Sequence, residues 1–196
     1  MKSIFFLLLC FTSELLYAQV DTVVVQYDST FTSLFSRRLN DKRTAIIYTM
    51  EDRGDVRDVN VYLSTLEEIV SGRKMYAVRI DARLNRNLFT DAPVANAEYI
   101  DEDELPLFIE RLEFLLSKVM NTNPNNLRYT EYRFYTRSGI ALECYTGLSR
   151  WRVALIYEID KRSIFTYINN EAQVRDLLEV LKATHKEILL RRGNKY

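Results

Sequence analysis

The chain has 196 residues, in which 27 Lys and Arg balance 27 Asp and Glu and one His is present. A net charge of zero and a pI near 6.6 argue against a nucleic-acid-binding domain, which needs a basic face for the phosphates. The same balance gives no support for an electrostatic membrane-surface module. A hydrophobic content of 47%, with five Gly and three Pro, excludes disordered, collagen-like and low-complexity chains.

The first 18 residues have the pattern of a secretory signal peptide. Lys2 provides a short positive start, residues 4–11 form an apolar run, and Ala18 is the small residue at the expected cleavage site. We therefore expect cleavage after Ala18 and export to the periplasm or beyond, in a Gram-negative bacterium. Lipid attachment at Cys10 and an uncleaved anchor are the alternatives.

Residues 19–196 are expected to form a single α+β domain. Cys144 is then the only cysteine, so no internal disulfide can form and stability must come from the core. Its position in a strand predicts a buried structural thiol. No apolar stretch after the signal peptide approaches the length of a membrane-spanning helix, so we expect no membrane span there.

Alternation of apolar and polar residues predicts strands in the first half of the chain. We expect these strands at 44–50, 56–63 and 74–82. The sequence DRGD at 52–55 is typical of a hairpin loop. The segment 65–70 is compatible with a helical turn or a strand, and 83–97 is expected to be a long loop.

A helix is predicted at about 104–120, because apolar residues recur there at spacings of three and four. Asp103 is its expected N-cap, which places Pro106 in the first turn, where a missing N–H does no harm. The acidic run 101–104 would then stabilise the helix start through the macrodipole. A calcium site is the weaker alternative, since the run lacks the alternating ligands and the glycine of an EF-hand loop.

The second half predicts an antiparallel meander followed by a longer helix. The strands are expected at 129–136, 140–146, 151–159 and 163–168. The helix is expected at about 171–190, where Asn170 and Gln173 make a start that resembles a capping box. Gly193 follows the end of this helix, as is typical of helix C-termini.

Strands followed by a helix, in both halves, predict an α+β fold with antiparallel meanders and two long helices packed on one face. The halves 44–120 and 127–190 also resemble each other weakly, since Ile109 aligns with Leu177 when their helices are matched. A duplicated meander-plus-helix unit is one interpretation. A single sheet with two helices and a chance similarity is the other.

Motifs for common catalytic chemistries are absent from the sequence, including the phosphate-binding loops, GxSxG, HExxH and paired CxxC. His185 lies beside the apolar stripe of the second helix and is interpreted as a boundary residue. The basic cluster Arg37, Arg38, Lys42 and Arg43 is interpreted as a solvated surface. We therefore expect no catalytic residue, no metal site and no cofactor.

Strand phase in the second meander separates two faces. The face expected under the helices carries Tyr132, Phe134, Ile140, Leu142, Cys144, Trp151, Val153, Leu155 and Tyr157. The other face carries Tyr129, Glu131, Arg133, Tyr135, Glu143, Tyr145, Arg152 and Glu158. Tyr and Arg are enriched in binding hot spots, although an Arg/Glu pattern also suits an ordinary solvated sheet.

The sequence thus favours a non-enzymatic binding or interaction module, whose partner is an unknown protein or a carbohydrate. The candidate binding residues are Tyr129, Arg133, Tyr135, Tyr145 and Arg152. The alternative is a small carbohydrate-active hydrolase that uses a pair of the glutamates Glu131, Glu143 and Glu158 on one sheet face.

Overall fold

The computed structural model describes residues 32–83, 95–124, 129–147, 149–159, 162–168 and 170–193. The expected signal peptide, its cleavage after Ala18 and the alternative of a lipid at Cys10 lie outside the described residues. None of the described helices is both long and apolar enough to cross a membrane.

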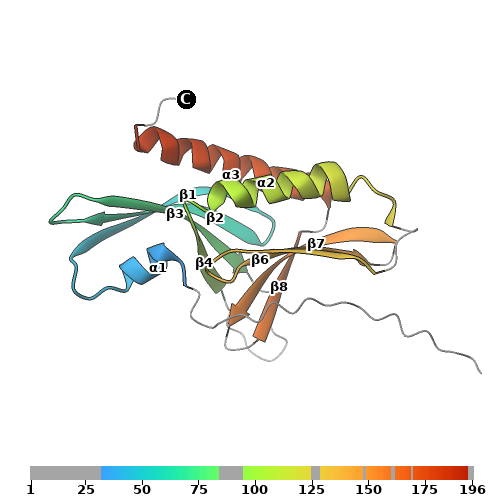
Figure 1. Ribbon diagram of the computed structural model, residues 1–196, viewed down its shortest axis with the longest axis horizontal. Helices are drawn as coiled ribbons and strands as arrows, with labels where there is room; N and C mark the ends of the chain where they lie inside the picture. The colour runs from blue at the N-terminus through green and yellow to red at the C-terminus, as the bar shows by residue number, and fades with distance from the viewer. Residues whose placement is uncertain are drawn as a thin grey trace, which may run out of the picture.

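Two four-stranded antiparallel sheets form the body of the protein, and two helices lie side by side over them (Figure 1). The elements of the first half are α1 (Leu34–Leu39), β1 (Ile46–Val56), β2 (Val59–Glu68), β3 (Lys74–Arg83), β4 (Ala95–Asp101), α2 (Leu105–Phe114) and the π-helical turn η1 (Leu115–Val119). The elements of the second half are β5 (Glu131–Tyr135), β6 (Ala141–Gly147), β7 (Arg150–Ile159), β8 (Arg162–Ile168) and α3 (Glu171–Arg191).

Strands that follow each other in the chain are neighbours in space, in the orders β1-β2-β3-β4 and β5-β6-β7-β8. Every pair is antiparallel. The short connections that follow β1, β2, β5 and β6 can join only antiparallel neighbours. Each half therefore has four antiparallel strands followed by a helix. The predicted α+β fold with antiparallel meanders and two long helices is confirmed, with two sheets in place of one.

A single hydrophobic core joins both sheets to α2 and α3. It includes Leu63 and Ile80 from the first sheet and Leu142 and Leu155 from the second. All residues expected under the helices in the second meander belong to this core or pack against it. Because the two sheets share one core, the core-facing side of each sheet is covered partly by residues from the other half of the chain.

The two helix starts differ from each other. Asn170 accepts a hydrogen bond from the backbone N–H of Gln173 at 2.9 Å, so the predicted cap of α3 is confirmed. The N-cap of α2 is Glu104, which makes no side-chain capping bond, so the assignment of Asp103 as N-cap is wrong. Pro106 lies in the first turn of α2, as expected.

The first hairpin turns later in the chain than predicted. Residues 52–55 lie within β1, where the pairing register shifts between Asp52 and Gly54, and the turn falls at Arg57 and Asp58. Gly54 has a φ of 125° and its N–H donates to Oδ1 of Asp52 at 2.9 Å. These residues therefore form a β-bulge, which uses the same residue types as a turn.

Two further elements of the first half were not predicted. Part of the expected loop 83–97 is β4, whose residues pair with β3 from Ala95 to Asp101. Short Ala and Asn side chains give this strand a weak pattern. The helix α1 packs Phe35 against Leu66 and Tyr99, on the side of the first sheet opposite α2 and α3. Among the described elements, no helix covers the corresponding side of the second sheet (Figure 1).

Candidate functional site

The side of the second sheet that points away from α2 and α3 is here called the outer face. Its residues follow from the strand register and are Glu131, Arg133, Tyr135, Ala141, Glu143, Tyr145, Arg152, Ala154, Ile156, Phe165 and Tyr167, with Tyr129 just before β5. All five predicted binding residues lie on it. The side chain of Glu158 lies outside the described residues.

Buried aliphatic residues form the middle of the outer face, and aromatic side chains lie beside them. Ala141, Ala154 and Ile156 are buried, and Tyr135 packs against them. Phe165 and Tyr167 are exposed by 44% and 42%, although both are large aromatic residues. Their rings are 6.3 Å apart and nearly parallel. The outer face therefore exposes two stacked aromatic rings to solvent.

Arg133 is fully engaged with neighbouring side chains. Its Nη2 lies 2.6 Å from Glu131 and 2.7 Å from Glu143, and its Nη1 donates to the hydroxyl of Tyr135 at 3.0 Å. Burial raises the pKa of Glu143, while the charge of Arg133 opposes that rise. Arg133 thus holds the outer face in place, and its charge is already compensated.

The same network bears on the hydrolase alternative. Such enzymes place two carboxyl groups on either side of a sugar, with their pKa values driven apart. Here the guanidinium of Arg133 lies between Glu131 and Glu143 and pairs with both carboxylates. The arrangement favours a structural ion network over a pair of catalytic acids.

Arg150 and Arg152 differ from Arg133, because neither forms an ion pair with a carboxylate of the described residues. The side chain of Arg152 lies across Gly147, where an added Cβ would come within 3.3 Å of its Cδ and Nε. The Nε of Arg152 is buried and has no hydrogen-bond partner. Arg150 has the same strand phase as Arg152 and lies at the end of the outer face. Among the described side chains, these two guanidinium groups have no carboxylate partner.

A small hollow of about 90 Å³ lies beside these arginines. It is lined by Arg150, Arg152, Val153, Tyr167 and Ile168. Burial, with the adjacent Tyr167 hydroxyl, raises the pKa of Tyr145, so this tyrosine is neutral at physiological pH. The hollow thus combines cationic donors with apolar and aromatic walls.

The contribution of Arg150, Phe165 and Tyr167 was not recognised from the sequence. The alternation in 163–168 already places Phe165 and Tyr167 on the phase opposite the buried Thr166 and Ile168. Their proximity to Arg152 depends on the pairing of β7 with β8, which aligns Ala154 with Tyr167.

The remaining candidates have structural explanations. Cys144 is fully buried, and burial raises the pKa of its thiol to about 12. Burial lowers the pKa of His185, which lies at the edge of the α3 interface. Within the described ranges, no group of three or more His, Cys, Asp or Glu could hold a metal ion.

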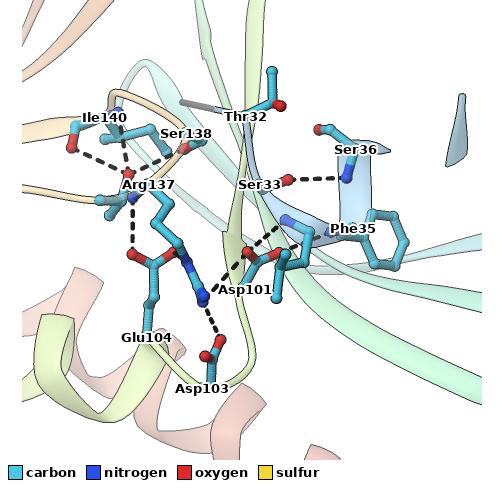
Figure 2. Close-up of polar contacts among 12 residues, drawn as sticks. Thr32, Ser33, Phe35, Ser36, Asp101, Asp103, Glu104, Arg137, Ser138 and Ile140 are labelled. Carbon is cyan, nitrogen blue, oxygen red and sulfur yellow. Dashed lines mark hydrogen bonds and ion pairs between the residues drawn. The ribbon is translucent and has the colours of Figure 1, made fainter. Parts of the chain in front are cut away.

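The acidic run 101–104 connects distant elements, which the helix-cap interpretation did not foresee (Figure 2). Asp101 is only 3% exposed. Its carboxylate accepts hydrogen bonds from the backbone N–H groups of Leu34 at 2.7 Å and Phe35 at 3.0 Å. The end of β4 is thereby attached to the start of α1.

Arg137, in the β5–β6 turn, meets the same acidic run from the other half of the chain (Figure 2). Its guanidinium pairs with Asp101 at 3.4 Å, with Asp103, and with Glu104 at 3.3 Å. Its backbone N–H also donates to Glu104 at 2.8 Å. Three carboxylates share one arginine here, so this cluster is a joint between the two halves of the chain.

Comparison with known proteins gives no match for this chain among family models, and no significant similarity to a curated protein or a solved structure.

Proposed function

We propose that this protein is an exported, non-enzymatic binding module whose outer face binds a protein partner that carries carboxylates. The observation that supports this proposal most is the pair Arg150 and Arg152, which form no ion pair with any carboxylate that the structure describes and line a small hollow beside the exposed ring of Tyr167. The other charged groups of that face among the described side chains, Glu131, Glu143 and Arg133, pair with one another.

The size of the hollow favours a macromolecular partner. Pockets that enclose small molecules usually measure about 300–1,000 Å³. A hollow of about 90 Å³ can accept one acidic side chain. The remaining contact would be made by the exposed rings of Phe165 and Tyr167. Exposed Tyr together with Arg is the composition typical of protein-binding hot spots.

The arginines are suited to a carboxylate because guanidinium groups bind it through two parallel hydrogen bonds. The absence of a side chain at Gly147 leaves the space in which the side chain of Arg152 lies. Desolvation beside Tyr167 and Ile168 would strengthen the pairing relative to an exposed ion pair.

Selection of peptides from a random library on the immobilised protein tests the proposal. We expect enrichment of peptides that combine Asp or Glu with apolar residues. The double variant Arg150→Gln/Arg152→Gln should bind a selected peptide at least about tenfold more weakly, since truncation at a desolvated charge pair costs roughly 2 kcal/mol or more. Tyr135→Ser/Tyr145→Ser should also lose binding.

The matched control is Arg175→Gln, which removes an exposed arginine on α3 and leaves the outer face unchanged. Thermal melting of each variant separates loss of binding from loss of folding. Selected peptides without acidic residues, or equal affinity for the Arg150/Arg152 variant and the control, would show that the proposal is wrong.

The export part of the proposal rests on the N-terminal sequence. The intact mass of the protein recovered outside the cytoplasm should correspond to a chain that begins at Gln19. A mass that includes residues 1–18, or a diacylated Cys10, would contradict it.

A further inference from the structure

Two aliphatic side chains project from the turn that joins β2 to β3. Ile69 is 59% exposed and Val70 is 92% exposed. Turns usually carry Gly, Asn, Asp or Ser at such positions, because those residues suit the backbone and solvent. The two aliphatic residues contribute no buried surface to the core, so folding gives no reason for them.

The turn holds these side chains outward. The backbone N–H of Glu68 donates to the carbonyl of Arg73 at 2.9 Å, and that of Gly72 donates to the carbonyl of Glu68 at 2.8 Å. Gly72 adopts a φ of 68°, which a glycine accepts without strain. Ile69 is also tied to Ala45 by a backbone hydrogen bond of 3.0 Å. The tip is therefore an ordered, convex end of the first sheet (Figure 1).

Basic residues gather next to this tip, although the whole chain is neutral. Three nearby carboxylates are engaged in ion pairs, Asp41 and Glu68 with Arg38 and Glu67 with Lys74. The basic residues around the tip are Arg37, Arg38, Lys42, Arg43, Arg73 and Lys74, and the acidic ones are Asp41, Glu67 and Glu68. Six positive charges against three negative ones leave this end of the molecule cationic.

The fold creates this cluster from two separate segments. The sequence places Arg37 to Arg43 in one short stretch, and the β2–β3 hairpin brings Arg73 beside it. Together they line an open depression of about 650 Å³ that also includes Leu34, which is itself exposed. Neither Lys42 nor Arg73 forms an ion pair in the part of the chain that the structure describes.

We propose that this end of the molecule binds the surface of an anionic phospholipid bilayer. Ile69 and Val70 would enter the interface between headgroups and acyl chains, while the surrounding Arg and Lys side chains pair with acidic headgroups. Exposed aliphatic residues beside a cluster of cations are the combination that peripheral membrane binding uses. The convex tip suits insertion into a lipid layer and would leave little contact area against a flat protein surface. The proposal is independent of the outer face, which belongs to the second sheet.

Co-sedimentation of the full chain with vesicles tests the charge requirement. We expect partitioning onto vesicles that contain phosphatidylglycerol, stronger than onto phosphatidylcholine vesicles, and weaker as salt is raised. Lys42→Gln/Arg73→Gln should lower the partition coefficient about fivefold per charge removed. Lys186→Gln, which removes an exposed charge on α3, is the matched control and should change it little.

A tryptophan at the tip tests insertion directly. The only native tryptophan, Trp151, is buried and gives a constant background. The emission of Val70→Trp should shift to shorter wavelength on anionic vesicles and be quenched by brominated acyl chains. Leu107→Trp, at an exposed aliphatic site on α2, should show neither change.

Ile69→Ser/Val70→Ser should reduce partitioning at least about tenfold, since several buried CH₂ groups are lost. Partitioning that does not depend on anionic lipid would overturn the proposal. Equal quenching at positions 70 and 107 would overturn it as well, as would a tip that binds an acidic protein and no vesicle.

Discussion

Asp101 shows how a buried charge can organise this fold. Its carboxylate is satisfied by two backbone N–H groups of α1 and by the guanidinium of Arg137. Such a group is tolerated only because all of its partners are present, and loss of one leaves an uncompensated charge. Asp103 contacts the same Arg137 but is 61% exposed, so the two acids should differ greatly in importance.

We expect Asp101→Ala to lower the free energy of unfolding by roughly 3–5 kcal/mol, as for other broken buried pairs. Asp103→Asn should lower it by less than about 1 kcal/mol, because exposed ion pairs contribute little. Urea titration of both variants measures the difference. Similar losses at the two positions would mean that Asp101 is not the residue that secures the joint.

Glu98 lies in β4 opposite Ile80, on the side of the sheet that faces the core. Burial raises the pKa of this carboxyl to about 7. The folded chain therefore binds its proton more tightly than the unfolded chain, whose pKa is near 4.5. The resulting stabilisation is complete below about pH 4.5, decreases as the pH rises and is lost above about pH 7.

Glu98→Gln should remove this dependence. The difference in unfolding free energy between wild type and variant should change by on the order of 1 kcal/mol between pH 4.5 and 7, after allowance for partial exposure to solvent. Urea titrations at several pH values measure it. Parallel pH profiles for the two proteins would contradict a buried, proton-binding Glu98.

Among the helices and strands, those with the clearest periodic spacing of apolar residues could be predicted from the sequence. The second meander and α3 follow clear alternation and a clear apolar stripe, so their inner residues could be assigned from the sequence. The strand β4 and the helix α1 could not, because β4 begins with short residues that pair through the main chain and α1 has only six residues.

The candidate site also has one part that the sequence predicts and one part that it does not. The five predicted binding residues share a strand phase, which a sequence reveals. The hollow could not be predicted from the alternation of residues along each strand. It forms because Arg152 lies over Gly147 and because β8 pairs with β7. Arg137 and the acidic run are likewise separated along the chain, so only the folded structure brings them together.

Substitutions in the two long helices test how much these helices contribute to the stability of the core. Leu112 and Leu181 are fully buried at the centres of their apolar stripes. Replacing either residue with Ala should cost roughly 2–5 kcal/mol in unfolding free energy. Leu107→Ala, on the exposed side of α2, should cost less than about 1 kcal/mol. A small loss at both buried positions would mean that the core does not depend on these helices.

For the whole molecule, the two proposed contacts occupy different sheets. The β2–β3 turn that carries Ile69 and Val70 belongs to the first sheet, and the outer face belongs to the second (Figure 1). The shared core and the joint at Asp101 and Arg137 connect the two sheets. This arrangement would allow one end to rest on a bilayer while the other remains accessible to a protein partner.

The most direct test of the outer face as a binding surface is photocrosslinking in the native host. Phe165→p-benzoylphenylalanine places the reactive group on the exposed aromatic surface, and the same replacement of Leu107 provides the control on α2. We predict a specific crosslinked protein from position 165 that is absent from position 107 and is lost when Arg150→Gln/Arg152→Gln is added. No crosslink at position 165, or the same products from both positions, would contradict a binding function for this face.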